Sequence, residues 1–178
     1  MVSADINGMD EFMTETGAAG APEFIDLAHV AQVIPIHWDE AVAVVQEVIG
    51  LLSAGGNELP VPSLDAVLIN ASGAITFRRT GRGERGPVGA GRMLHSLLSS
   101  ADVPVALRLF VSQANAPETY ASLGELAAGL AYYGKPGRAD LIRAVYERYA
   151  AANRSPAHHP PVPFVKPAPV ENARSVDN

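Results

Sequence analysis

The sequence contains no cysteine, and this absence excludes several kinds of chemistry together. Disulfide bonds, thiolate metal sites and cysteine nucleophiles are all ruled out in a chain of this composition. Charge is also sparse, because only 18% of the 178 residues are charged and the formal net charge is −6. A net negative chain lacks a bulk electrostatic attraction to nucleic acid or to an anionic membrane. We therefore expect neither as a partner.

Long apolar segments are missing as well. A membrane-spanning helix needs about 20 consecutive apolar residues, and no stretch of the sequence approaches that length. The first 24 residues carry acids where a secretory signal carries basic residues and then an apolar core. Together with the missing cysteine, these features predict a cytoplasmic protein. Hydrophobic residues nevertheless make up 48% of the chain, which is enough to bury a core.

Composition divides the chain into three parts. Residues 1–22 are rich in glycine, alanine, threonine and acids without a hydrophobic period, which predicts a flexible N-terminal arm. Residues 155–178 hold six prolines in 24 residues, a composition typical of polyproline II or disorder. We therefore assign 153–178 to a proline-rich, disordered tail. Residues 23–152 remain as one globular domain.

Hydrophobic spacing within that domain predicts a mostly α fold, a helical bundle with one small β-hairpin. Asp39 and Glu40 suit the positive end of the first helix, and Ser122 with Glu125 makes a capping-box pattern before another. The apolar content of 104–114 favours a helix after Pro104 but also tolerates a strand. Helices are expected over residues 37–54, 91–100, 104–114, 122–134 and 138–152.

The hairpin is expected between the first two of these helices. Residues 67–69 and 74–77 are apolar or β-branched, and they flank a polar Asn-Ala-Ser-Gly turn that contains Gly73.

Residues 81–88, GRGERGPV, fit two phosphate-binding patterns by letter. They match G-x-G-x-x-G-x-V, the Gly-rich loop that covers ATP in protein kinases, and their first six letters match the dinucleotide fingerprint. The fingerprint requires a strand before the loop and a parallel strand after the helix, whereas here a hairpin precedes and no convincing strand follows. The kinase loop requires a lysine-bearing strand after it, and the first lysine of this chain is Lys135. We interpret both matches as coincidental.

The order of elements over residues 36–134 resembles the C-terminal lobe of a protein kinase. WDEAVAVVQEVIGLLSAGG resembles the long helix before the catalytic loop, and LPVPSLDAVLINASGAITFRRTG resembles the segment that runs through a hairpin to Asp-Phe-Gly. GRMLHSLLSS resembles the helix after the activation segment, and residues 107–133 resemble the final bundle. The resemblance lies in hydrophobic positions and turns. It implies a kinase-like fold without an N-terminal lobe, a degenerate pseudokinase fragment in which 81–88 is a shortened activation segment.

The catalytic residues of that family do not carry over to this chain. The resemblance places Val61 at the catalytic Asp, Ala66 at the magnesium-binding Asn, and Arg79 at the Asp of Asp-Phe-Gly. A valine cannot accept a proton, and an alanine side chain offers no oxygen to a metal ion. We therefore expect no kinase activity, no catalytic residue, no metal site and no cofactor.

Five arginines make a local basic cluster in this acidic chain. Together with a Gly-rich backbone they are a candidate contact for a phosphate or an acidic partner, although a solvated turn fits the same pattern. The five are Arg78, Arg79, Arg82, Arg85 and Arg92.

Other polar residues suit simpler roles. His158 and His159 lack a third fixed metal ligand, and His37 and His95 are single. No nucleophile-elbow motif supports a hydrolase set, for which Ser112, Ser122 and Asp140 are the nominal residues. The aromatic residues suit either the core or an interface, and these are Trp38, Tyr132, Tyr133, Tyr146 and Tyr149.

These features lead to one leading hypothesis, a non-catalytic pseudokinase-like module that acts in protein–protein interaction or regulation. Its contacts would lie on the helical bundle or on the proline-rich tail, whose P-x-x-P-like spacing suits an aromatic groove. Two alternatives stay open: a structural or assembly subunit of a larger complex, and an enzyme of unrecognised type. A protein partner is expected both for the pseudokinase-like module and for the assembly subunit.

Overall fold

The structure is a computed structural model that describes residues 23–154 apart from 55–58, 79–82, 85 and 99–101. This part of the chain is mostly helical with a small β component, which confirms the predicted fold class at that level. The six helices are α1 (Leu27–Val33), α2 (Trp38–Ala54), α3 (Gly86–Leu97), α4 (Val105–Ala114), α5 (Leu123–Ala131) and α6 (Arg138–Arg154).

The expected hairpin is present, and it belongs to a larger β component. Strands β3 (Val67–Asn70) and β4 (Ile75–Phe77) pair antiparallel, and β1 (Phe24–Asp26) adds a third strand against β3. A second sheet joins β2 (Val61–Pro62) to β5 (Gly83–Glu84). The single-hairpin prediction was therefore incomplete. Strands of two or three residues are too short to show an alternating pattern in the sequence.

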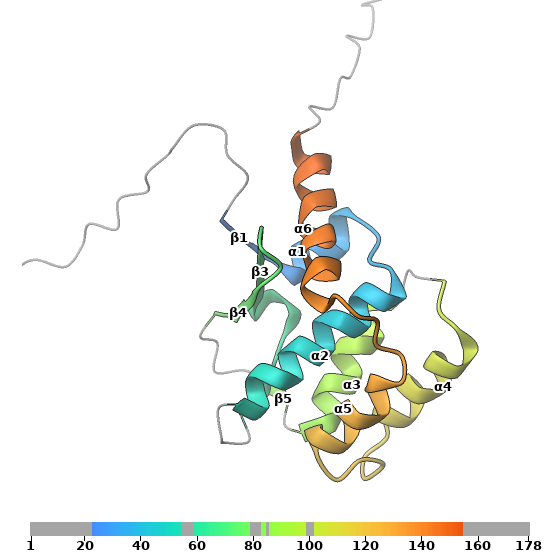
Figure 1. Cartoon of the computed structure of the whole chain (residues 1–178). Helices are drawn as coiled ribbons and strands as arrows, with labels where there is room; N and C mark the ends of the chain where they lie inside the picture. The colour runs from blue at the N-terminus through green and yellow to red at the C-terminus, as the bar shows by residue number, and fades with distance from the viewer. Residues whose placement is uncertain (1–22, 55–58, 79–82, 85, 99–101, 155–178) are drawn as a thin grey trace, which may run out of the picture.

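Helix α2 is the centre of the molecule. It packs against α3, α5 and α6, and every residue from Glu40 to Val45 is buried. In Figure 1 the three-stranded sheet lies to one side of α2, beside α1 and α6, whereas α3, α4 and α5 gather on its other side. A helix that is apolar on nearly all sides is expected to be a buried one, which is the position α2 takes.

The turn of the hairpin supports the start of α6. Gly73 has a φ of +80°, and a Cβ at this position would lie 2.1 Å from the carbonyl oxygen of Ala139. A side chain there would strain the backbone and push α6 off the turn. The predicted turn glycine is therefore also a packing glycine.

Helix α3 begins at Gly86, before the predicted start at residue 91. Pro87 suits the first helical turn, where its missing N–H leaves no hydrogen bond unmade. Gly91 permits close packing, since a Cβ there would lie 2.6 Å from the carbonyl oxygen of Ala114 in α4. Residues 83–84 and 86–88 are thus a strand and the start of a helix. This corrects the expectation that the Gly-rich residues before 91 form a turn, for the residues that the structure describes. The interpretation of 81–88 as a shortened activation segment stays a prediction.

The remaining helix boundaries follow local signals closely. Residues 105–114 form a helix, which settles the helix-or-strand alternative for this segment. The Ser122 hydroxyl accepts from the N–H of Glu125 at 3.2 Å, and the Glu125 carboxylate accepts from the N–H of Ala121 at 2.7 Å. The capping prediction is confirmed, although α5 ends at Ala131 and not at residue 134.

The last helix extends beyond the predicted domain end. Helix α6 continues to Arg154, two residues into the part assigned to the tail. Residues 1–22 and 155–178 lie outside the described residues, so the flexible arm and the disordered tail stay predictions.

Candidate functional site

The two described positions that the kinase resemblance assigns to catalysis lie in the core. Val61 in β2 is 2% exposed, and Ala66, which ends the short 3-10 turn Leu64–Ala66, is fully buried. Neither side chain can transfer a proton or hold a cation. Arg79 lies outside the described residues.

A pocket of about 450 Å³ lies beside β2 and β5, and an ion pair lies on its rim. Arg92 on α3 contacts Glu84 on β5 with 2.8 Å between Nη1 and Oε1, and both side chains are largely exposed. Arg92 is thus the one member of the predicted arginine cluster that the structure shows in an ion pair. Arg78 is exposed, and Arg79, Arg82 and Arg85 lie outside the described residues, so the cluster as a whole stays a prediction.

A second pocket, of about 510 Å³, lies between α3 and α4. Sequence reasoning considered His95 and Ser112 separately, and the structure brings both to this pocket. Arg108 and Asn115 were not predicted as site residues. Their spacing is the signal that could have indicated them, because Arg108, Ser112 and Asn115 recur at i, i+4 and i+7 and therefore share one side of α4. The seven lining residues are His95, Leu98, Val103, Arg108, Val111, Ser112 and Asn115.

An aromatic cluster joins α4 to α5. The ring of Phe110 lies 5.5 Å from that of Tyr133 and 5.7 Å from that of Tyr120. The Tyr133 hydroxyl donates to the carbonyl oxygen of Ala106 at 3.1 Å. Burial raises the pKa of Tyr120, and the charges of Glu125 and Tyr133 raise it further. The end of α5 is therefore tied to the outer side of α4.

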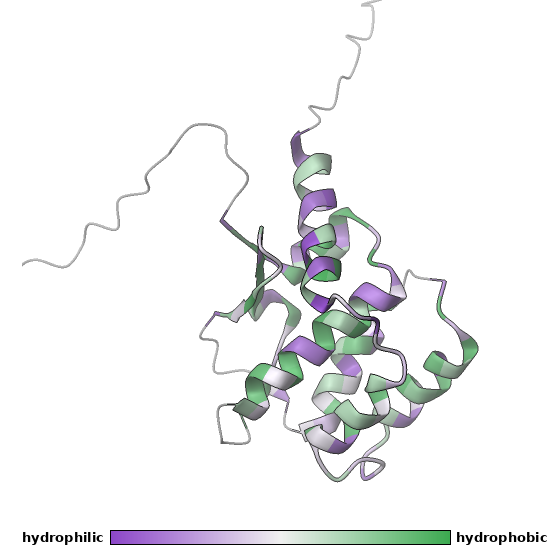
Figure 2. Ribbon diagram, viewed as in Figure 1, coloured by the Kyte–Doolittle hydropathy of each residue, from purple (hydrophilic) through white to green (hydrophobic). Residues whose placement is uncertain are grey.

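Beside this cluster lies a set of exposed hydrophobic side chains, here called the α4–α5 apolar surface. It consists of Val105, Leu109 and Tyr132, which are 72%, 62% and 86% exposed. Val105 and Leu109 are four residues apart, so they share one side of α4. Tyr132 packs edge-on against Tyr133, which reaches α4. Figure 2 shows the hydrophobic character of much of α4.

The structure divides the predicted core-or-interface aromatics into three groups. Tyr146 and Tyr149 are buried at 5% and 7% exposure, and both belong to the core. Trp38 and Tyr133 are half-buried, whereas Tyr132 faces solvent. Only Tyr132 is therefore available as an interface anchor without rearrangement.

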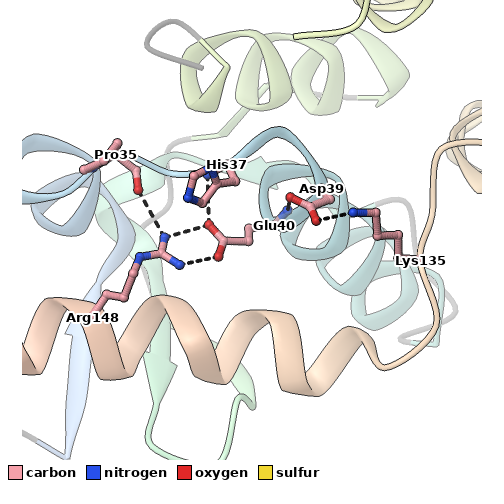
Figure 3. A network of polar contacts seen from close by, with 6 residues as sticks. All are labelled: Pro35, His37, Asp39, Glu40, Lys135 and Arg148. Carbon is pink, nitrogen blue, oxygen red and sulfur yellow. Dashed lines mark hydrogen bonds and ion pairs between the residues drawn. The ribbon is translucent and has the colours of Figure 1, made fainter. Parts of the chain in front are cut away.

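The network in Figure 3 joins the start of α2 to α6. Arg148 donates through both terminal nitrogens to the carboxylate of Glu40, with a distance of 2.7 Å for the Nη2–Oε2 contact. Arg148 also donates to the carbonyl oxygen of Pro35 at 3.1 Å, and Glu40 accepts from the backbone N–H of His37 at 2.9 Å. The hydrogen bond to Glu40 raises the pKa of Arg148.

A second ion pair lies next to this network. Lys135 donates to Asp39 at 2.7 Å, and its ammonium nitrogen lies 5.0 Å from the centroid of the Trp38 ring. Burial raises the pKa of Asp39, but the hydrogen bond and charge of Lys135 and two backbone N–H groups outweigh it, so the pKa lies below its ordinary value. Every charged member of the two pairs is matched, which points to a structural role.

The three nominal hydrolase residues lie on different elements of the described structure. Ser112, Ser122 and Asp140 belong to α4, the cap of α5 and α6 respectively. Within the described ranges, no group of three or more His, Asp or Glu side chains could hold a metal ion. His158 and His159 lie outside these ranges.

Comparison with known proteins gives no family for this chain. No protein-family model matches it, and no curated protein matches it significantly. None of the helices that the structure describes is long and apolar enough to cross a membrane. Function is therefore inferred from the arrangement of the residues themselves.

Proposed function

We propose that this chain is a non-catalytic, kinase C-lobe-like module that works by binding another protein. One observation carries the proposal. At the positions that the resemblance assigns to the catalytic Asp and the magnesium-binding Asn the chain has Val61 and Ala66, and both are buried. Burial adds to the sequence argument at Ala66, which a substrate or metal ion would not reach without local unfolding. Val61 lines the pocket beside β2, where its side chain offers only hydrocarbon.

The element order supports the kinase-like part of the proposal. A long helix α2, the hairpin β3–β4, helix α3 and the pair α4–α5 follow one another as the resemblance implies. Helix α3 packs against α2, α4 and α5, so it takes a central place among the later helices.

The α4–α5 apolar surface is the proposed contact for the partner. Val105 and Leu109 share one side of α4, and Tyr132 is linked to that helix through Tyr133. Exposed apolar side chains gathered in this way mark interaction sites, and tyrosine is a favoured anchor of protein interfaces. Val105, Leu109 and Tyr132 carry no charge, and the Tyr132 hydroxyl offers one polar contact at the edge. The fitting partner is a protein segment with an apolar stripe, such as one face of an amphipathic helix.

The catalytic half of the proposal is tested with ATP and magnesium on the purified full chain. We expect no shift of the thermal unfolding midpoint, no heat of binding in calorimetry and no phosphate release. Phosphate release that follows the protein through successive chromatographic steps at constant specific activity would contradict the proposal.

The binding half is tested by co-purification from the native host and mass determination of the complex, using Leu109→Lys and a matched control. Leu51→Lys is that control because Leu51 is another exposed leucine on a helix, at 38% exposure, outside this surface. We expect a stoichiometric partner with the native chain and with Leu51→Lys, and its loss with Leu109→Lys. A partner retained by Leu109→Lys would contradict the assigned surface, and a monomer with an occupied pocket would favour an enzyme.

A further inference from the structure

We propose that the pocket between α3 and α4 binds a small organic acid: a carboxylate with an apolar body and one hydrogen-bond donor. This inference is independent of the protein-binding function proposed above. The volume of the pocket, about 510 Å³, falls within the range of roughly 300–1,000 Å³ that small-molecule sites occupy. Three features of its lining define the ligand, and each is a separate observation.

The first feature is an uncompensated cation. Of the seven described arginines, four form ion pairs with described acids, namely Arg92, Arg138, Arg143 and Arg148, whereas Arg78, Arg108 and Arg154 do not. Arg108 is exposed and is the one among these seven that lines a pocket without an acid. Arg108 forms no ion pair with any described residue, and no carboxylate is among the residues lining its pocket. The planar guanidinium matches the two oxygens of a carboxylate, so an organic acid supplies the missing partner. His95 on α3 adds a second polar group to the lining.

The second feature is a buried acceptor without a donor. The Oδ1 atom of Asn115 is buried and has no hydrogen-bond partner among the described residues. A buried polar atom left unsatisfied costs about 1–3 kcal/mol, which a donor on the ligand would recover once the Asn115 amide turns its Oδ1 toward the pocket. Asn115 is held in place as the C-cap of α4, because its backbone N–H donates to the carbonyl oxygen of Val111 at 3.1 Å. The ligand therefore needs a hydroxyl or N–H group away from its carboxylate.

The third feature is an apolar wall. Leu98, Val103 and Val111 line the pocket and are 8%, 6% and 4% exposed, so most of each side chain is packed in the core and only its edge faces the pocket. A hydrocarbon body laid on them removes apolar surface from water. The combination of a cation, an acceptor and this wall favours an amphipathic acid over inorganic phosphate, which has no apolar part.

The test is an NMR titration of the full chain, with the methyl groups of Leu98, Val103 and Val111 as reporters. The principal probe is 4-hydroxybenzoate, which carries all three features. Benzoate lacks the donor, 4-hydroxybenzyl alcohol lacks the anion, and inorganic phosphate lacks the body. We expect saturable shifts of the three reporters with 4-hydroxybenzoate, and binding by benzoate that is about threefold to tenfold weaker. The alcohol and phosphate are expected to bind more weakly still.

Two variants and a control assign the contacts. We expect Arg108→Gln to weaken the binding of 4-hydroxybenzoate by about tenfold or more. We expect Asn115→Ala to abolish the preference for 4-hydroxybenzoate over benzoate while leaving benzoate affinity nearly unchanged. Arg143→Gln, which removes the same charge on α6 outside the pocket, is expected to bind as the native chain does. Asn115 has no side-chain partner to lose, so Asn115→Ala is expected to fold.

Three results would overturn the proposal. The first is no saturable shift of the reporters at about 10 mM probe, which would mean that the pocket holds only water. The second is an equal loss of 4-hydroxybenzoate affinity in Arg108→Gln and Arg143→Gln, which would show that the anion responds to the net charge of the protein and not to Arg108. The third is a preference for 4-hydroxybenzoate that survives Asn115→Ala.

Discussion

Glu40 is the one charged residue that is buried in the described part of the chain, at 4% exposure. Its carboxylate caps the start of α2 and also forms an ion pair. It accepts from the backbone N–H of His37 at the start of α2, and it receives both terminal nitrogens of Arg148 from α6. A buried charge is tolerated only when it is paired and hydrogen-bonded, so the pairing of α2 with α6 depends on Arg148.

Replacing Arg148 with methionine is therefore expected to destabilise the fold by about 2–3 kcal/mol, because it leaves a buried carboxylate unpaired. Chemical denaturation followed by circular dichroism measures this change. The control is Arg143→Met, which removes an exposed ion pair with Asp140 and should change stability by less than about 1 kcal/mol.

The double variant Glu40→Met with Arg148→Met separates the cost of the stranded charge from the value of the pair. An apolar replacement of both partners is expected to recover most of the lost stability, because no charge then remains buried. A double variant that is as unstable as Arg148→Met would refute this account of the network.

Asp39 gives a pH-dependent prediction at the same end of α2. Its pKa lies below the ordinary 3.8 in the folded protein, so folding favours the ionised form. The stability it contributes is fully present above the unfolded-state pKa and is lost as the pH falls through the folded-state pKa. We expect Asp39→Asn to lower stability at neutral pH and to have progressively less effect as the pH falls below about 4.

Urea unfolding of the native chain and of Asp39→Asn between neutral pH and about pH 3 measures this difference. Lys135→Gln should reproduce most of the effect at neutral pH, since it removes the partner of Asp39. A difference between Asp39→Asn and the native chain that stays constant across this range would contradict the assigned role.

At the scale of elements, glycine has opposite effects on stability in two helices. Gly91 in α3 lies against α4, where a Cβ would be 2.6 Å from the carbonyl oxygen of Ala114. Gly50 in α2 has no atom within 4 Å of the position of a Cβ. The first glycine permits a close helix contact, whereas the second only weakens its helix.

Alanine substitutions at these two glycines are therefore expected to act in opposite directions. Gly50→Ala should stabilise the protein by about 0.5–1 kcal/mol, because alanine favours the helix. Gly91→Ala should destabilise it by about 1–3 kcal/mol, because α3 and α4 must separate. Thermal unfolding midpoints of the two variants measure both changes, and a gain in stability from Gly91→Ala would show that the α3–α4 contact is not tight.

The start of α3 shows why the sequence misled at this scale. Four glycines in residues 83–91 are typical of a loop when only propensity is considered. The structure uses Gly89 and Gly91 for contact with β5 and α4, a tertiary reason that no local pattern contains. By contrast, the Ser122–Glu125 cap of α5 was predictable because its hydrogen bonds join residues only three or four positions apart.

At the scale of the whole molecule, α2 connects the two ends of the described fold. It contacts α3, α5 and α6, and the side chain of Trp38 at its start lies under Lys135 from the α5–α6 connection. A single continuous core runs from the three-stranded sheet to α4. This arrangement predicts that the described residues unfold as one unit.

Trp38 provides the test, because it is the one tryptophan in the whole sequence. We expect denaturation curves from its fluorescence and from far-ultraviolet circular dichroism to coincide. Circular dichroism reports all helices, whereas the fluorescence reports the junction of α2 with the α5–α6 connection. A fluorescence transition at lower denaturant would show that this junction opens before the rest of the fold.

The sequence alone determined the helical class, the hairpin with Gly73 and the absence of thiol chemistry. It also indicated the five helices after α1, with a late start for α3 and a strand alternative left open for α4. These features depend on composition or on residues within a few positions of one another. Only the tertiary structure decided that Arg108 and Asn115 share a pocket with His95, that Glu40 pairs with Arg148, and that Tyr132 faces solvent whereas Tyr146 does not. The physical reason is that burial and charge pairing are set by partners far away in the chain, and helical spacing alone does not show which face of a helix meets them.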